Sequence, residues 1–238
     1  MRLVVWDTKD VKCEDWEGTS DIFIRAFFDA KKAKETDTHF RCQNGKGSFN
    51  YRMLFELENP GDTFTLSVQV WDRDIFKSND FIGDASINLK LPMIDCTETD
   101  QQINVNKKYY DGFLKNHMGE ARLDFADETS FWLDMRDKNG DYNGKVKVQV
   151  DIFPIEKAQA NAVGAGRGEP NHSPFLPPPV GRLQWSLNPF KMLNQCVGPA
   201  VRRKIYCCCC LVLCLALTVF VAPMIISNLI SDAINPFN

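Results

Sequence analysis

The sequence predicts an all-β domain, an eight-stranded antiparallel β-sandwich, followed by a linker and a single C-terminal transmembrane α-helix. Eight apolar or alternating runs, separated by polar loops, fill residues 1–153. The clearest run is Lys145–Phe153, in which apolar residues alternate with polar ones as they do on a half-buried strand. Short strands joined by polar loops favour a sandwich over a βαβ fold.

The loops between the runs carry their own signals. Asn139-Gly140, between the last two runs, is typical of a hairpin turn. The interval from Leu91 to Thr129 is too long for one loop, and pieces such as Lys107–Met118 are candidates for a helix. In chain order, we expect strands at Leu3–Trp6, Ile22–Phe28, Thr36–Arg41, Phe49–Leu57, Phe64–Trp71, Ile82–Leu89, Ser130–Met135 and Lys145–Phe153.

The residues after the sandwich divide into three parts. Residues 154–204 are rich in Ala, Gly, Pro and Asn, and we expect a juxtamembrane linker that is flexible over Ala158–Gly168. Residues 205–230 carry no charged side chain and are long enough to cross a bilayer core of about 30 Å. Residues 231–238 form a short tail. Trp185, Phe190 and Met192 lie in the linker at points where they would meet the membrane interface.

Charge at the two ends of the apolar run predicts its orientation. Arg202, Arg203 and Lys204 directly precede the run, so the positive-inside rule places the sandwich in the cytosol and the tail in a lumen or outside the cell. No apolar stretch opens the chain, so we expect no secretory signal peptide. These features indicate a tail-anchored protein of the plasma membrane or a vesicle, or the end of a longer protein.

Cysteines gather at the start of the membrane span. Consecutive cysteines on a helix point in different directions, so Cys207–Cys210 cannot close a tetrahedral zinc site alone. S-palmitoylation at the membrane face and plain apolar filling are the two alternatives. The remaining cysteines follow no pairing pattern, and a cytosolic domain would keep them reduced.

Composition excludes some functional classes. The chain of 238 residues has a formal net charge of −3, with 28 basic and 31 acidic residues, which is not the footprint of a nucleic-acid-binding protein. Its three histidines are isolated and no Ser/His or Cys/His arrangement stands out, so we expect no enzyme. Asp137–Asp141 resembles the opening of an EF-hand loop but lacks the later glycine and glutamate, so we interpret it as a hairpin turn.

Five aspartates at two loops are the strongest functional signal. Each group follows an apolar run and therefore sits on a loop at a strand end. One such loop alone is typical of a solvated acidic turn, but two matched loops favour a bound cation, because close carboxylates otherwise repel one another. An oxygen-rich cage suits calcium. The proposed metal ligands are Asp15, Asp21, Asp72, Asp74 and Asp80.

Apolar and basic residues near these loops predict lipid contact. Trp16 follows Asp15, and Ile75 and Phe76 follow Asp74, so apolar side chains would lie at the loop tips. Packing in the core is the alternative for these three residues. Three lysines form a basic cluster that would bind acidic headgroups or, equally, lie on a solvated hairpin edge. They are Lys31, Lys32 and Lys34.

Residues 1–153 resemble a C2 domain with calcium at apical loops, and the two aspartate groups match that family's ligands without a gap. Ile22 departs from the pattern, since many members have proline after the aspartate that Asp21 matches. The order of domain, linker and span resembles the C-terminal part of the ferlin family, as do Trp6–Val11, Gly168–Asn171 and Asn188-Pro189.

The resemblance implies a membrane-anchored protein that binds anionic phospholipid membranes when calcium is present, in vesicle fusion, membrane trafficking or membrane repair. It also implies membrane-fusion proteins as partners. Ferlins carry several C2 domains in tandem, so functions that depend on upstream domains are not implied. A calcium-independent adaptor that binds protein partners beside the membrane is the alternative.

Overall fold

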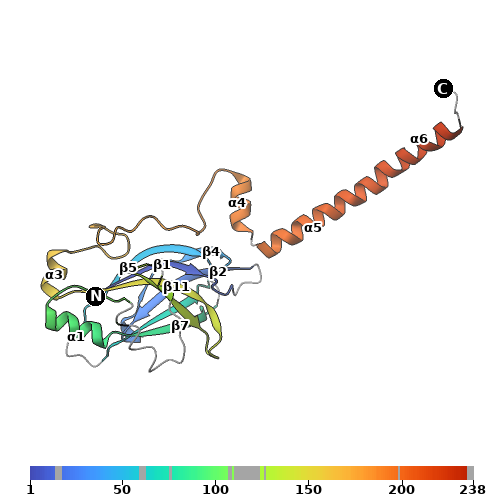
Figure 1. Ribbon diagram of the computed structural model, residues 1–238. Helices are drawn as coiled ribbons and strands as arrows, with labels where there is room; N and C mark the ends of the chain where they lie inside the picture. The colour runs from blue at the N-terminus through green and yellow to red at the C-terminus, as the bar shows by residue number, and fades with distance from the viewer. Residues whose placement is uncertain are drawn as a thin grey trace.

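The computed structural model describes residues 1–13, 18–58, 63–74, 77–106, 109, 124–125, 127–197 and 199–234. It shows an antiparallel β-sandwich with a long helix leaving one end (Figure 1). The long strands are β1 (Arg2–Lys9), β2 (Thr19–Phe27), β4 (His39–Gln43), β5 (Gly47–Leu54), β6 (Thr65–Asp72), β7 (Asp80–Asn88), β10 (Phe131–Arg136) and β11 (Tyr142–Ile152).

Two layers of strands face each other across one core. The hydrogen-bonded order is β3-β2-β6-β7-β10-β11-β1-β5, with β4 paired to β2. The junction of the layers is a single register pair, Asp84 with Arg136, between β7 and β10. Apolar residues from both sides of that junction, such as Val70 of β6 and Val148 of β11, belong to one buried cluster. Of the two-residue strands, β3 (Lys34–Glu35) lies at one edge, while β8 (Ile103–Asn104) pairs with β11 and β9 (Asp124–Phe125) pairs with β10.

The eight predicted strands are all present, with ends that differ by a few residues, so the predicted fold class is confirmed. The sequence did not predict helix α1 (Lys90–Thr99), which buries Met93 and Cys96. Pro92 lies in its first turn, where a missing N–H costs no helical hydrogen bond, so this proline does not break the helix. Nearly all of the helix candidate Lys107–Met118 lies outside the described residues.

Residues 163–183, hereafter the strap, pack along the edge strand β5. Backbone hydrogen bonds join Arg52 to Gly166 in both directions, at 3.1 and 2.8 Å, and join Ser48 to Val180 in both directions, at 2.8 and 2.9 Å. Edge strands have backbone groups that lack a partner in the sheet, and the strap supplies such partners to β5. The sequence predicted flexibility over Ala158–Gly168. The structure differs at Gly166, because the backbone of Arg52 holds this residue by two hydrogen bonds.

A buried arginine holds the middle of the strap. The Arg52 side chain is fully buried, and its guanidinium donates to the carbonyl oxygens of Gly164 at 3.0 Å, His172 at 2.9 Å and Pro174 at 2.6 Å. A buried charge needs such acceptors, since leaving it unsatisfied costs several kcal/mol, on the order of 3–5, in folded proteins. The side chain of Leu176 is also buried.

Asp37 fastens both ends of the strap. Its Oδ2 lies 2.6 Å from Arg167 near the beginning of the strap and 2.8 Å from Arg182 near its end. The strap therefore follows β5 from Arg52 towards Ser48, antiparallel to that strand. In Figure 1 it runs from α3 (Ile155–Ala160) across the sandwich to α4 (Pro189–Cys196).

One helix in the described part of the chain is long and apolar enough to cross a membrane. It spans Ala200–Ile230, and none of its apolar window is buried in the protein. It comprises α5 (Pro199–Ala216), a π-helical turn at Leu217–Val221 and α6 (Ala222–Ile234). Its 31 residues correspond to about 46 Å, longer than a bilayer core of about 30 Å. Arg202–Lys204 can therefore lie among the headgroups.

His39 is a buried histidine at the start of β4. It has no exposed surface, its ring stacks on Phe49 with centroids 3.9 Å apart, and neither ring nitrogen has a hydrogen-bond partner in the part of the chain that the structure describes. Burial lowers the pKa of His39 to about 4, against 6.5 for an ordinary histidine. The folded state thus favours the neutral ring, and the unfolded state binds more protons between these two pH values. Stability should fall as the pH falls through that window.

Changing His39 to Gln should remove the His39 part of this acid destabilisation. Between neutral pH and pH 4, the free energy of unfolding of the wild type should fall by on the order of 3 kcal/mol more than that of the variant. Urea unfolding of the full chain in detergent micelles, followed by tryptophan fluorescence across this range, measures it. The matched control is His172→Gln, because His172 is exposed. Identical pH profiles for His39→Gln and wild type would contradict the assignment.

Candidate functional site

Strand pairing brings three of the predicted ligands to one end of the sandwich. In the β2–β6 register Ile22 lies opposite Asp72, so Asp21 is next to Asp72. In the β6–β7 register Asp72 lies opposite Asp80. Asp74 follows β6 by two residues at the same end. We call this the carboxylate end of the domain.

Backbone N–H groups orient two of these carboxylates. The N–H of Asp21 donates to Oδ1 of Asp72 at 2.6 Å, and the N–H of Arg41 on β4 donates to Oδ1 of Asp21 at 2.7 Å. The side chain of Asp72 is almost fully buried, with 4% of the residue exposed. Three neighbouring strands thus fix the positions of these two acids without any bound ion.

A lysine lies between the other two acids. Lys77 Nζ is 2.6 Å from Oδ2 of Asp80 and 3.4 Å from Oδ2 of Asp74. The hydrogen bond to Asp80, followed by the charge of Asp74, raises the pKa of the Lys77 ammonium. Oδ2 of Asp74 is buried and accepts no hydrogen bond, so this ion pair is its only described polar contact. Lys77 was not among the residues predicted from the sequence, although it lies three residues from each of these acids.

The described residues fit a cation only in part. In the described ranges, no group of three or more His, Cys, Asp and Glu side chains is arranged to hold a metal ion. Asp15 lies outside those ranges. Two observations favour a cation at this end: a side-chain ammonium already lies between Asp74 and Asp80, and the buried Oδ2 of Asp74 accepts no hydrogen bond from the described residues. Carboxylate oxygens are also the ligands that calcium prefers.

Of the predicted lipid contacts, the structure describes only the three lysines. Trp16, Ile75 and Phe76 lie outside the described residues. The basic cluster lies at the opposite end of the domain, because β2 runs from Asp21 to its end and only then leads to Lys31, Lys32 and Lys34. Lys34 pairs with Ala26, which is five residues along β2 from Asp21, a rise of about 16 Å. The lysines therefore do not share a surface with the carboxylates.

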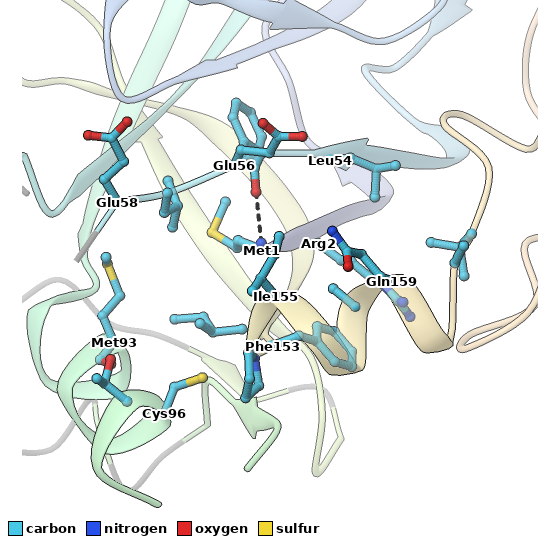
Figure 2. A pocket seen from close by; sticks show the side chains of 18 of the residues that line it. Met1, Arg2, Leu54, Glu56, Glu58, Met93, Cys96, Phe153, Ile155 and Gln159 are labelled. Carbon is cyan, nitrogen blue, oxygen red and sulfur yellow. Dashed lines mark hydrogen bonds between the residues drawn. The ribbon is translucent and has the colours of Figure 1, made fainter. Parts of the chain in front are cut away.

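A cavity of about 1200 Å³ opens beside this basic cluster (Figure 2). Apolar side chains such as Met93, Phe153 and Ile155 line one part of it. Lys32 and Lys34 line it as well, but so do Glu56, Glu58 and Asp100, so charges of both signs surround the cavity. This mixture gives no preference for an anionic headgroup, and the carboxylate end remains the better site.

Comparisons with known proteins agree with the fold. A C2 domain family model matches residues 1–104. Ferlin 1 of Toxoplasma gondii is 27% identical over 181 residues, covering 74% of this chain and 11% of that protein. Myoferlin of Mus musculus is 26% identical over 263 residues, covering 95% of this chain and 13% of that protein. The chain thus spans about a tenth of the length of these relatives.

Among solved structures, a C2 domain of plant Extended Synaptotagmin 1 is similar, with 17% identity and a TM-score of 0.41, covering 62% of this chain and 88% of that one. The sandwich, with carboxylates gathered at one end, is a C2 domain. Over most of its length the chain is homologous to the ferlins. The resemblance predicted from the sequence is confirmed.

Changing Lys77 to Gln should tighten calcium binding by roughly two- to five-fold, because the ammonium competes with an ion for Asp74 and Asp80. Calorimetric titration of the full chain in detergent micelles with calcium measures the effect. Lys138→Gln is the matched control: it removes one positive charge from a neighbouring turn, where Lys138 lies 5.7 Å from the ring of Phe81. Equal affinities in both variants would mean that Lys77 acts only through net charge.

Proposed function

We propose that this chain is a membrane-anchored protein whose C2 domain binds anionic phospholipid in response to calcium, in vesicle fusion, membrane trafficking or membrane repair. C2 domains commonly bind calcium and phospholipid membranes, and the ferlin homology supports a role in membrane traffic. The observation that carries the proposal is the gathering of Asp21, Asp72, Asp74 and Asp80 at one end of the sandwich. The proposal is for a binding protein and assigns no catalytic step.

The proposed calcium ligands are these four aspartates together with Asp15. Without calcium, the acids at this end repel anionic headgroups, and Lys77 offsets only part of their charge. Calcium would supply positive charge and open coordination positions for phosphate oxygens of the lipid. Lipid affinity would then rise with calcium.

The backbone around the acids supports an electrostatic switch without refolding. Asp21 and Asp72 are each held by a backbone N–H, so the strands that carry them need not move when the charge changes. The side chain that must move is Lys77, which is exposed and can turn towards solvent or lipid phosphate. A switch of this kind changes local charge and leaves the sandwich as it is.

The candidate span and the basic residues before it support the proposed orientation. Arg202–Lys204 precede the apolar helix, so the domain would lie in the cytosol and residues 231–238 in a lumen or outside the cell. The anchor would lie in a vesicle or the plasma membrane. Membrane-fusion proteins remain proposed partners on the strength of the ferlin homology alone.

One observation favours a second function. Because Lys77 already neutralises part of the carboxylate end, the domain can be stable without calcium, as a calcium-independent adaptor for protein partners would be. The two functions differ in a single measurement. An adaptor gives no heat of calcium binding.

Changing both Asp72 and Asp74 to Asn should abolish calcium binding and calcium-dependent sedimentation with phosphatidylserine vesicles. The fold should survive, because the amide that replaces the carboxylate of Asp72 retains an oxygen to accept the N–H of Asp21. Calorimetry and the calcium-induced rise in melting temperature of the full chain measure the loss.

The matched control is the double variant Asp137→Asn with Asp141→Asn, which removes the same charge from the β10–β11 turn. We expect it to bind calcium as wild type does. If calcium still raises the melting temperature of the Asp72/Asp74 variant by the wild-type amount, the ligand assignment is wrong.

A glycosylation tag placed after Asn238 should be modified when the chain is made with microsomes, because the tail would lie in the lumen. A tag placed before Met1 should stay unmodified, and gel mobility with and without deglycosylation measures both. Modification of the N-terminal tag alone would reverse the proposed orientation.

A further inference from the structure

We propose that the carboxylate end of the C2 domain engages the same bilayer that the chain's own helix crosses. This inference rests on the proposed function and names the membrane that the site would meet. It follows from three observations: the contacts of Gln43, the position of Arg202 on the helix, and the exposed apolar side chains of residues 184–196, hereafter the juxtamembrane segment.

Gln43 joins the carboxylate end to the start of the anchor. Its side-chain Nε2 donates to the carbonyl oxygen of Asn194 on α4 at 3.1 Å, and its Oε1 accepts from Arg202 on α5 at 3.5 Å. Gln43 ends β4, opposite Thr19 of β2. Two residues earlier on the same strand, the N–H of Arg41 holds Asp21. One short strand therefore connects an acid of the site with the base of the anchor.

The position of Arg202 sets the distance to the membrane. Arg202 lies three residues before the uncharged run begins at Ile205, a rise of about 4.5 Å along the helix. That places it among the headgroups, whose layer is about 5–7 Å thick on each side of the bilayer core. Gln43 contacts Arg202 and hence lies at this level. Arg41 is two residues, or about 7 Å, further along β4.

The juxtamembrane segment presents apolar side chains outward. Trp185 is 84% exposed, Leu187 93% and Phe190 76%. Some of its polar groups bond within the segment: Oδ1 of Asn188 accepts from the N–H of Phe190 at 3.0 Å. Helix α4 is amphipathic and carries Phe190, while Trp185 and Leu187 lie in the chain just before it. Such a group of exposed side chains suits the boundary between headgroups and acyl chains, where tryptophan is favoured.

The short link between α4 and α5 makes the bilayer that the helix crosses the membrane that would cover this apolar surface. Helix α4 ends at Cys196 and α5 begins at Pro199. Three peptide units span at most about 11 Å, so the segment stays beside the membrane whatever its orientation. Lys191 adds a positive charge that suits anionic headgroups. A protein partner is the competing occupant, and the experiments below separate the two.

The first experiment measures calcium affinity with the full chain reconstituted in vesicles, its domain facing outward. Phosphatidylserine is placed either in the anchoring bilayer or only in added protein-free vesicles, with phosphatidylcholine elsewhere. Linkage requires that lipid which binds with calcium also raises calcium affinity. We expect at least a ten-fold rise in affinity for radioactive calcium when the anchoring bilayer holds phosphatidylserine, and none from the added vesicles.

Every other outcome of this experiment contradicts either the inference or the proposed function. A rise produced only by the added vesicles would show that the site faces a second membrane and would overturn the inference. Calcium binding that ignores phosphatidylserine in both places would overturn it too, while leaving the metal site intact. No calcium binding in any sample would defeat the proposed function itself, and the inference with it. Gln43→Ala should weaken the effect of the anchoring bilayer and leave intrinsic calcium affinity in micelles unchanged.

The second experiment locates Trp185. Nitroxide-labelled lipids in the anchoring bilayer should quench part of the tryptophan emission of the full chain, and Trp185→Phe should remove that quenched part while keeping an apolar side chain. Moving the tryptophan with Trp185→Phe and Phe175→Trp is the matched control, since Phe175 is also exposed but lies on the strap. We expect no quenching from position 175. Equal quenching at both positions, or none at 185, would overturn the interfacial placement.

Discussion

The burial of the Arg52 guanidinium constrains the route of the chain from the sandwich to the membrane. Strand β11 ends at the end of the domain opposite the carboxylates, since Asp151 pairs with Arg2 at the beginning of β1. The strap then brings the chain back along β5, because three of its carbonyl oxygens accept hydrogen bonds from the two terminal nitrogens of Arg52. Without that return, the helix would begin at the far end of the domain. The position of the anchor beside the carboxylates depends on this one buried charge.

The carboxylate end depends in turn on strand register. A slip of one residue between β2 and β6 would turn Asp72 to the other face of the sheet and separate it from the N–H of Asp21. The buried apolar residues on these strands, Ile22, Ile24, Val68 and Val70, resist that slip because it would also expose them to water. The core therefore fixes the geometry of the acids, and Lys77 compensates their charge.

Much of the sandwich and of the carboxylate end could be predicted from the sequence, because the patterns that indicate strands and strand ends are local. Alternation of apolar and polar residues predicted all eight long strands, and placing the aspartates at strand ends predicted that Asp21, Asp72 and Asp80 would meet. Helix α1 was missed because Pro92 looks like a helix breaker outside its first-turn position. The bridging position of Lys77 could not be predicted because Lys77 lies between β6 and β7, where no strand period fixes which side chains meet.

The strap and the contacts of Gln43 could not be predicted in the same way. A stretch of Gly, Ala and Pro has no apolar period, and its conformation is fixed by partners more than a hundred residues earlier in the chain, such as Arg52 and Asp37. Gly166 gives the one local hint: its φ of +63° is left-handed, and a Cβ there would lie 3.1 Å from the ring of Tyr51. No local pattern marks Gln43.

The strap also determines how the protein responds to mechanical load. Tension between domain and membrane acts on the helix first and then on the contacts of Gln43. Within the strap it next reaches the hydrogen bond of Leu183 with Phe40 and the ion pair of Arg182 with Asp37, and only then the hydrogen bonds of Val180 with Ser48. Those bonds release before the bonds at Gly166, so the strap would peel from β5 one contact at a time. Each freed residue lengthens the tether by about 3.3 Å. Under tension the strap would therefore act as an extensible tether between the domain and the membrane.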